Sequence, residues 1–271
     1  MKIHKHGFVN LLEVMGSDEE VENAARISYG EGTRKVSQTR NLIRYLMRHK
    51  HTSPFEMCEV KFHIKLPIFI MRQLVRHRTA NINEYSGRYS LMSDEFYLPA
   101  EADVQEQSTS NIQGRGQDLD EENKILVLSR MVAVTDQAKE CYRQIATPTL
   151  LDGFHEGFKG VARELARTVL PVSNYTECIW KIDLNNFFHF AKLRMDAHAQ
   201  KEIQDYANAM YELVQPKFPI CCEAFEDYIL NSKTFSAKEM KIIKDNLNGS
   251  WVMSKYGLSE RESKEFLEKL K

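Results

Sequence analysis

The feature that most constrains the fold is an alternation of apolar and polar residues that ends at a proline. In the stretch EVKFHIKL (59–66), apolar residues occupy every second position: Val60, Phe62, Ile64 and Leu66. Side chains point alternately to the two faces of a β-strand, so this pattern predicts a strand with one buried face. Pro67 follows directly and suits the first position of a helix, which PIFIMRQLVRHR would form. A strand followed at once by a helix is typical of a chain that mixes both kinds of element.

The N-terminal region predicts three further elements and a loop. FVNLLEVMG (8–16) predicts a strand, and SDEEVENAARIS (17–28) predicts a helix with Ser17 as N-cap and acidic residues in its first turn. A glycine-containing loop is expected at 29–35, and helical spacing of apolar residues predicts a helix at 39–51.

The second half of the chain is mainly helical in pattern. Residues 124–169 have helical spacing with glycine interruptions, and 184–214 predicts one long helix. The polar segment 101–123 predicts a mobile loop or insertion. We therefore expect one α+β domain over residues 1–225, with a central mixed sheet flanked by long helices. Residues 226–271 are charged and helix-prone, and we expect them to form a helical C-terminal extension of unknown role.

Composition limits the classes of protein that fit. The chain has 271 residues, a formal net charge of -1 and a pI near 6.8, whereas a general nucleic-acid binder would usually show a basic excess. The N-terminus lacks the apolar run and cleavage site of a signal peptide, and no stretch approaches the length of a membrane span. We expect a protein without a nucleic-acid or membrane partner.

Cysteine and histidine spacing gives no metal-site signal. The five cysteines are odd in number and form no CxxC: Cys58, Cys141, Cys178, Cys221 and Cys222. A disulfide framework or a structural zinc site is therefore not expected, and we expect a reduced, cytoplasmic protein. His49 and His51 are two residues apart, so they would not meet on a helix to bind a metal.

One short segment concentrates positive charge in this nearly neutral chain. RHRTANINEYSGRYS (76–90) places three arginines and a histidine around one acid, Glu84, with a Ser86-Gly87 pair between them. Arginine holds phosphate by paired, charge-assisted hydrogen bonds, and a Ser-Gly turn can direct backbone N–H groups at an anion. The alternative is that the arginines only face the negative end of a helix. We favour an anion site.

This segment resembles the RHR-x7-S signature of the flavin-dependent thymidylate synthases, the ThyX family. Four other stretches are similar to motifs of the same family and follow in its order: ENAARISYG (22–30), HTSPFE (51–56), ARTVLPVSNYT (166–176) and LRMDAHAQKEI (193–203). The resemblance spans roughly residues 8–225 and leaves the tail outside it.

The resemblance implies a methyltransferase that converts dUMP to dTMP. Methylenetetrahydrofolate would supply the carbon, NADPH would supply reducing electrons through bound FAD, and the active sites would lie between subunits of a homotetramer. The chain has no GxGxxG after a strand, so FAD would be held by side chains and a turn. The alternatives are a non-catalytic flavin- or nucleotide-binding protein on the same scaffold, and an RNA-binding protein that uses the basic segment.

The resemblance also implies roles for particular residues. One set of expected flavin contacts comes from the first half of the chain: Ser53, Arg76, His77, Arg78 and Glu84. A second set, expected partly from neighbouring subunits, is Asp183, Leu184, Asn185 and His189. The expected dUMP contacts are Gln73, Arg76, Glu84, Ser86, Gly87, Arg88, Arg167 and Arg194.

Arg194 is the expected catalytic residue. Its guanidinium stays protonated, so it cannot be a simple general base, but it can stabilise a uracil ring that has lost its N3 proton. Its position on the predicted helix differs from that of Asn185 and His189, so we expect these residues to serve different sites or subunits. By spacing alone Arg194 would be a surface residue paired with Asp196 or His198.

Two candidate nucleophiles, Ser86 and the pair Cys221-Cys222, have weaker support than the role of Arg194. Ser86 lacks a visible base, and the pair Cys221-Cys222 lacks the Pro-Cys-His surroundings of the unrelated cysteine-dependent thymidylate synthases. The chain also departs from the family pattern at Met57, Asn81 and Lys201, and at Leu74-Val75 before the RHR segment. These departures affect the expected ring stacking and folate docking but remove no phosphate-binding arginine.

Overall fold

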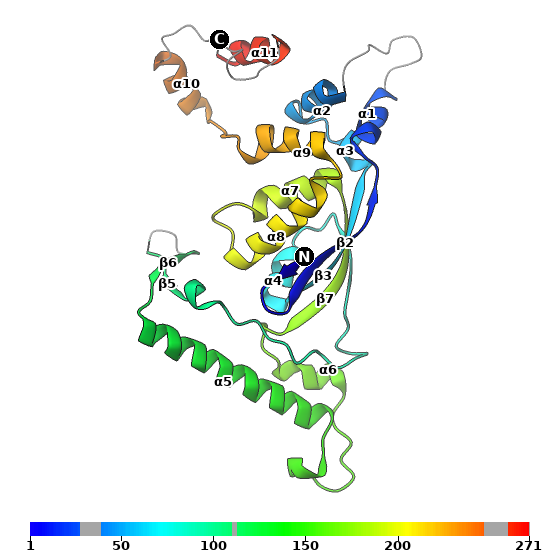
Figure 1. The fold of residues 1–271 in the computed structure, drawn as a ribbon, viewed down its shortest axis with the longest axis vertical. Helices are drawn as coiled ribbons and strands as arrows, with labels where there is room; N and C mark the ends of the chain where they lie inside the picture. Colours follow the sequence, from blue (N-terminus) through cyan, green and yellow to red (C-terminus); the bar gives the residue numbers. More distant parts are fainter. Residues whose placement is uncertain (28–38, 110–112, 247–259, 271) are drawn as a thin grey trace. The chain divides into compact units, whose positions relative to one another are not determined.

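A computed structural model describes residues 1–27, 39–109, 113–246 and 260–270 (Figure 1). The expected glycine loop at 29–35 lies outside the described residues. The chain forms two compact units, Met1–Leu230 and Asn231–Lys271. The second unit contains helices α10 (Ala237–Asn246) and α11 (Glu260–Leu270).

The first unit is built around a five-stranded sheet in the order β1-β2-β3-β7-β4. The strands are β1 (Lys2–Ile3), β2 (Gly7–Met15), β3 (Glu59–Pro67), β4 (Asn81–Glu84) and β7 (Tyr175–Asp183). All four neighbouring pairs run antiparallel, so the expected mixed sheet is wrong. The long connection between β3 and β7 brings β7 back beside β3 in the opposite direction. A mixed sheet would require at least one connection that brings two neighbouring strands into parallel alignment.

The predicted alternation on β3 is confirmed. Val60, Phe62, Ile64 and Leu66 are at most 1% exposed, while the residues between them are partly exposed. Figure 1 shows helices α7 (Leu184–Arg194) and α8 (Lys201–Val214) against one face of the sheet. Phe62 packs on Phe187 of α7, with ring centroids 6.0 Å apart. The apolar face of the sheet and these helices form the core.

The predicted single helix over 184–214 is wrong, because the structure divides it into α7 and α8. The intervening residues make local bonds that compete with a helical backbone. The Asp196 carboxylate accepts a hydrogen bond from the backbone N–H of His198 at 2.8 Å, and Gln204 Nε2 donates to the carbonyl of Ala199 at 2.7 Å. The break leaves Arg194 at the end of α7 and Gln200 at the start of α8.

The polar segment 101–123 is more ordered than expected. Strands β5 (Gln105–Gln107) and β6 (Arg115–Asp118) pair antiparallel in the β5–β6 hairpin, and residues 110–112 lie outside the described ranges. The hairpin leads into helix α5 (Glu121–Ala146), which begins at an Asp120 N-cap. The helical pattern expected to 169 ends with α5, and only the short α6 (Arg163–Ala166) and 3-10 turns follow.

Smaller helices connect the ends of the sheet. Helices α1 (Asp18–Arg26) and α2 (Thr39–Arg48) confirm the helices predicted at 17–28 and 39–51, with shorter ends, and α3 (Ser53–Glu56) follows. Ser17 is the N-cap residue of α1 but makes no side-chain capping bond to the helix. Helix α9 (Pro219–Phe225) contains Cys221 and Cys222, both fully buried, and a π-helical turn (Glu226–Leu230) ends the unit.

Candidate active site

The arginine-rich segment begins just after helix α4 (Ile68–Leu74), which ends four residues before Arg78. The chain leaves the helix through turns in which the N–H of Arg76 donates to the carbonyl of Gln73 and that of His77 to Leu74. The side chains of Arg76 and Arg78 are exposed. Across the described residues, no carboxylate forms an ion pair with either guanidinium, so both are free to bind an anion.

His77 contacts helix α7 at its C-terminal end. Its Nε2 accepts a hydrogen bond from Arg194 Nε at 3.0 Å, and its ring meets those of Phe190 and His189 at centroid distances of 5.0 and 6.2 Å. Partial burial, together with the charges of Arg194 and His189, lowers the pKa of His77 to about 4. The imidazole is therefore neutral at physiological pH, with its proton on Nδ1 and its lone pair facing Arg194.

His189 and Arg194 are five positions apart on α7, or about 140° around the helix axis. The sequence expectation assigned them to different sites for this reason. The structure instead brings both against His77, which comes from another part of the chain and lies between them. Helical spacing alone cannot show that His77, from another part of the chain, contacts both His189 and Arg194.

The predicted Ser86-Gly87 turn is present. The backbone N–H groups of Tyr89 and Ser90 donate to the carbonyl of Ser86, and its Oγ accepts from the N–H of Arg88 at 3.3 Å. A Cβ added to Gly87 would lie only 3.1 Å from Cδ of Arg167, so this glycine allows close approach of the arginine. Ser86 thus serves the turn. Among the described residues, no histidine, lysine or carboxylate forms a hydrogen bond with its hydroxyl, so the base that a nucleophile needs is missing.

Helix α6 supplies partners to this turn that the sequence did not reveal. Arg88 Nε donates to Glu164 Oε2 at 3.0 Å, and Arg163 donates to the carbonyl of Tyr89 at 2.7 Å. Both side chains of the Arg88–Glu164 pair are more than half exposed, so the pair adds about 0–1 kcal/mol. An anion could displace Glu164 at little cost.

Glu84 lies at the end of the edge strand β4. Its Oε1 accepts a hydrogen bond from Thr176 Oγ1 of the neighbouring strand β7 at 2.9 Å. This contact could not be predicted from local sequence, because Thr176 is 92 residues away along the chain. One carboxylate oxygen of Glu84 is thereby held in place while the residue remains exposed.

The remaining expected flavin contacts lie at the other end of α7. Asp183 is the N-cap of this helix and accepts from the N–H of Asn186 at 2.9 Å, and Leu184 is fully buried. The N–H of Leu184 donates to the carbonyl of Cys58, close to the helix α3 that begins at Ser53. At 1.5 Å per residue, Asn185 and Arg194 are about 13.5 Å apart along the axis.

The expected site residues therefore fall into three groups in one chain. They are the group around His77 and Arg194, the group around the Ser86-Gly87 turn, and the group at the start of α7. Among the described residues, no hydrogen bond, ion pair or ring contact that the structure contains joins one group to another. Arg76 and Arg78 form no ion pair among the described residues, and the ion pair of Arg88 is exposed. These guanidinium groups are donors that suit phosphates, so the first two groups fit an anionic nucleotide.

The alternative centres have no matching geometry. The structure contains no group of three or more His, Cys, Asp or Glu residues that could hold a metal, as far as the described residues extend. All five cysteines are free. Burial raises the pKa of Cys222 to about 12 and also raises that of Cys221, so neither is an activated thiolate.

Comparison with solved structures identifies the class of fold. A UMP/dUMP methylase from Streptomyces cacaoi, solved with 5-Br UMP bound, is similar with a TM-score of 0.70 and 32% sequence identity. The match covers 84% of this chain and 97% of that one. A structure of the same enzyme with 5-Br dUMP matches with a TM-score of 0.70 and 31% identity, over 84% of this chain and 98% of that one.

Comparison with known sequences identifies the family. Residues 10–220 match the family described as "Thymidylate synthase complementing protein". A flavin-dependent thymidylate synthase from Ehrlichia ruminantium is 47% identical, covering 99% of this chain and 87% of its own. One from Treponema denticola is 46% identical, covering 100% and 96%. The chain belongs to the flavin-dependent thymidylate synthase family, as the sequence motifs predicted.

Proposed function

We propose that this protein reductively methylates dUMP to dTMP, with methylenetetrahydrofolate as carbon donor and NADPH as reductant through bound FAD. The observation that carries the proposal is the similarity, over almost the whole chain, to proteins named flavin-dependent thymidylate synthase. The structural similarity to a methylase solved with brominated UMP and dUMP supports dUMP as the substrate.

The arrangement of cationic groups supports the binding of two anionic ligands. Arg88 and Arg167, together with the Ser86-Gly87 turn, would hold the phosphate of dUMP. Arg76 and Arg78 would face the pyrophosphate of FAD, with Ser53, Glu84 and the start of α7 as further contacts. Bound FAD would supply the redox and one-carbon chemistry, and the protein would orient the reactants.

Arg194 would act on the uracil ring. Burial lowers its pKa from the usual value, but a guanidinium remains protonated at neutral pH. It would stabilise the ring with its N3 proton removed, which raises electron density at C5, the carbon to be methylated. The neutral Nε2 of His77 would hold Arg194 in position by accepting its Nε proton.

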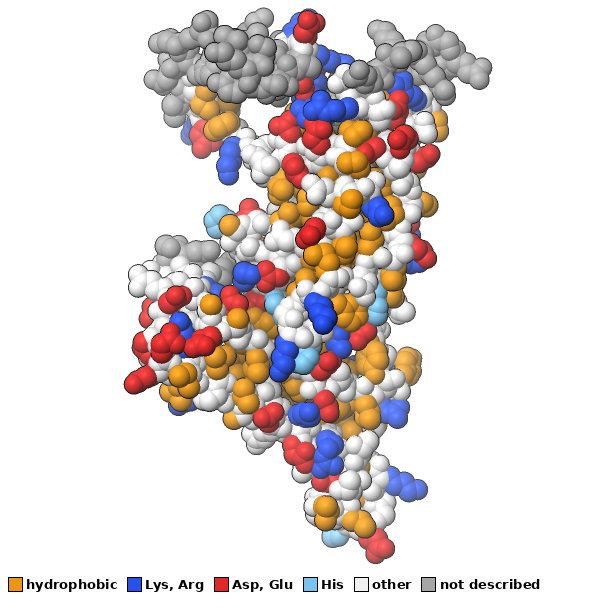
Figure 2. All heavy atoms as spheres, viewed as in Figure 1, with side chains coloured by type: hydrophobic (Ala, Val, Ile, Leu, Met, Phe, Trp, Pro, Cys, Tyr) orange, Lys and Arg blue, Asp and Glu red, His pale blue; other side chains and the backbone are white. Residues whose placement is uncertain are grey.

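The separation of the three groups supports a homotetramer with shared active sites. Helix α5 carries exposed apolar side chains, including Ile125 (62%) and Val134 (59%), and Figure 2 shows hydrophobic side chains at the surface over this helix. Exposed apolar patches of this kind mark interaction sites. A second copy of the chain that covers α5 would bring residues of one subunit to the site of another.

The domain division and the compartment are also proposals. Residues 1–225 would carry the activity and residues 226–271 would form the extension. The free thiols of the five cysteines support a reducing compartment such as the cytoplasm. In the described part of the chain, no helix is both long and apolar enough to cross a membrane.

The test is a reconstituted reaction. Purified protein is incubated with dUMP, methylenetetrahydrofolate, FAD and NADPH, and dTMP is quantified together with NADPH oxidation. Formation of dTMP that stops when any one component is omitted supports the proposal. Binding of FAD and dUMP without dTMP under any of these conditions would instead identify a non-catalytic binding protein.

A further inference from the structure

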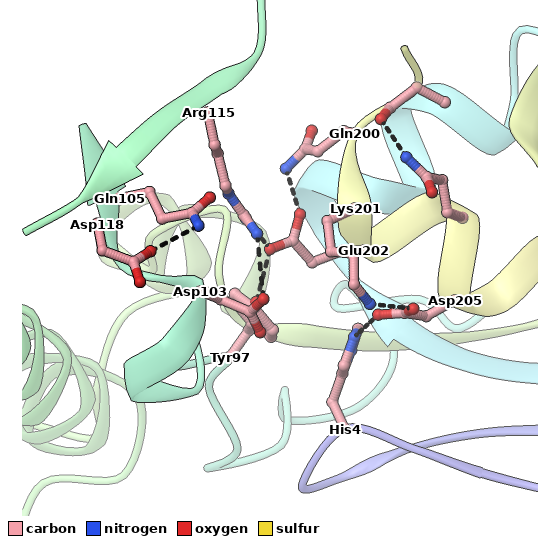
Figure 3. A network of polar contacts seen from close by, with 12 residues as sticks. His4, Tyr97, Asp103, Gln105, Arg115, Asp118, Gln200, Lys201, Glu202 and Asp205 are labelled. Carbon is pink, nitrogen blue, oxygen red and sulfur yellow. Dashed lines mark hydrogen bonds and ion pairs between the residues drawn. The ribbon is translucent and has the colours of Figure 1, made fainter. Parts of the chain in front are cut away.

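A chain of hydrogen bonds leads from the buried carboxylate of Glu202 through Gln200 to Gln73, which is one of the expected dUMP contacts. Figure 3 shows the part of this chain around Glu202 and Gln200. Glu202, near the start of α8, is only 1% exposed. Its Oε1 accepts from the hydroxyl of Tyr97 at 2.6 Å and from Arg115 of the β5–β6 hairpin. Its Oε2 accepts from Gln200 Nε2 at 2.9 Å.

Glu202 is ionised in this setting. Burial by itself would raise its pKa, but the hydrogen bonds from Tyr97 and Arg115 hold the pKa below its usual value. An ionised carboxylate can only accept hydrogen bonds. It therefore determines which end of the Gln200 amide faces it, and this end must be the NH2 group.

The orientation of Gln200 then determines that of Gln73. Because Gln200 turns its NH2 toward Glu202, its carbonyl oxygen Oε1 is left to accept, and it accepts from Gln73 Nε2 at 2.6 Å. The Gln73 amide consequently keeps its own oxygen Oε1 available. The NH2 group and the oxygen of a side-chain amide exchange places when the amide is flipped. This chain of hydrogen bonds selects one of the two orientations of Gln73.

We propose that Glu202 is a positioning residue that acts through Gln200 to make Gln73 present a hydrogen-bond acceptor to the nucleotide. The inference rests on the proposed function, in which Gln73 contacts dUMP. The ligand group would be a hydrogen-bond donor. dUMP offers two neutral donors, the 3′-hydroxyl of the sugar and the N3–H of the ring.

The substitution Glu202→Gln tests this directly because it nearly preserves volume and inverts the chain. The oxygen of the new amide must take the Oε1 position, where Arg115 can only donate. Its NH2 then faces Gln200, whose amide turns over and donates to Gln73. Gln73 must accept with its oxygen and turn its NH2 toward the nucleotide, so that a donor faces a donor.

The measurement is the affinity for dUMP, 2′,3′-dideoxy-UMP and N3-methyl-dUMP by titration calorimetry on the FAD-loaded protein. We expect E202Q to weaken dUMP binding roughly tenfold, the cost of about one hydrogen bond, and to raise KM for dUMP more than it lowers kcat. The analogue that lacks the recognised donor should bind the native protein and E202Q equally. A loss with 2′,3′-dideoxy-UMP but not with N3-methyl-dUMP would assign the ring N3–H, and the reverse would assign the 3′-hydroxyl.

Asp205→Asn is the matched control. Asp205 lies on the same helix one turn further on and pairs with His4 and Lys201, with no bond to Gln200 (Figure 3). D205N should bind dUMP like the native protein, and thermal unfolding should show both variants folded. If E202Q binds dUMP and both analogues more weakly by the same factor, the inference is wrong. Normal turnover by the native protein would then leave the proposed function intact. Failure of the native protein to bind dUMP would overturn both.

Discussion

Arg194 donates a hydrogen bond from its Nε to Nε2 of His77 over 3.0 Å, and this contact joins two motifs that are 117 residues apart. It fixes the tautomer of His77, because Nε2 must carry a lone pair. It also uses the Nε–H of the guanidinium, which leaves the terminal NH2 groups for a ligand. The proposed catalytic residue thus has a defined orientation before substrate binds.

Removing the acceptor from residue 77 should impair turnover. We expect His77→Phe to lower kcat for dTMP formation by roughly 10- to 100-fold, because a misplaced catalytic group loses the benefit of orientation. His77→Gln can place an amide oxygen near the position of Nε2 and should retain more activity than the phenylalanine variant. Equal activity of the two variants, measured at equal flavin content, would contradict a positioning role.

The titration of His77 should be displaced to acid. Its pKa falls from 6.5 to about 4 because of burial and of the nearby Arg194 and His189. Between these values the unfolded chain binds more protons than the folded one, so this residue lowers stability as pH falls through the window from 6.5 to 4. NMR titration of the imidazole, assigned with His77→Gln, should give a midpoint near 4, and a midpoint above 6 would be inconsistent with the contact.

Substitution of Arg194 should separate catalysis from flavin binding. Arg194→Ala should reduce dTMP formation roughly 100-fold or more, as expected when a group that stabilises developing charge is lost. Arg194→Lys keeps a positive charge but cannot donate in the same planar geometry, so it should recover only part of the activity. Both variants should retain flavin absorbance, and normal turnover in either would remove Arg194 from the mechanism.

The sequence was informative where local pattern decides structure. The alternation from Val60 to Leu66 predicts a buried strand face, and the motif order predicts the family. Local pattern did not predict that α7 ends at Arg194. The apolar spacing continues through the break, where local bonds such as those of Asp196 and Gln204 compete with the helix.

Long-range contacts at the site could not be predicted from spacing. The partners of Glu84 and Arg88 are Thr176 and Glu164, each more than 70 residues distant. The same limit applies to the sheet, since the direction of β7 beside β3 depends on the path of the whole connection. The sequence therefore predicts candidate site residues, whereas their pairing with one another required the fold.

Glu164 should compete with the phosphate of dUMP for Arg88. We expect Glu164→Gln to tighten dUMP binding about two- to fivefold at low salt, because it removes an ion pair that the ligand must break. The gain should shrink as salt rises and screens the exposed charges. Glu140→Gln is the matched control, since Glu140 pairs with Arg143 on α5. Weaker dUMP binding by the Glu164 variant would show that Glu164 assists the site.

Asp18 should contribute strongly to stability although it lies outside the site. This residue is only 5% exposed, and its two carboxylate oxygens accept hydrogen bonds from the backbone N–H groups of Ile220 (2.9 Å) and Cys221 (3.0 Å). Both N–H groups belong to the first turn of α9, where the helix itself provides no acceptor. Asp18 of α1 thus connects the two helices at a buried junction.

Asp18→Ala should therefore lower the free energy of unfolding by roughly 2–4 kcal/mol, because two buried donors lose their acceptors. Asp18→Asn keeps one acceptor oxygen and should cost less, which distinguishes hydrogen bonding from packing. Glu19→Ala is the control in the same turn, where an exposed residue should change stability by no more than about 0.5 kcal/mol. Urea unfolding of the three variants measures these differences, and an Asp18→Ala variant as stable as the Glu19→Ala control would show that α9 finds other acceptors.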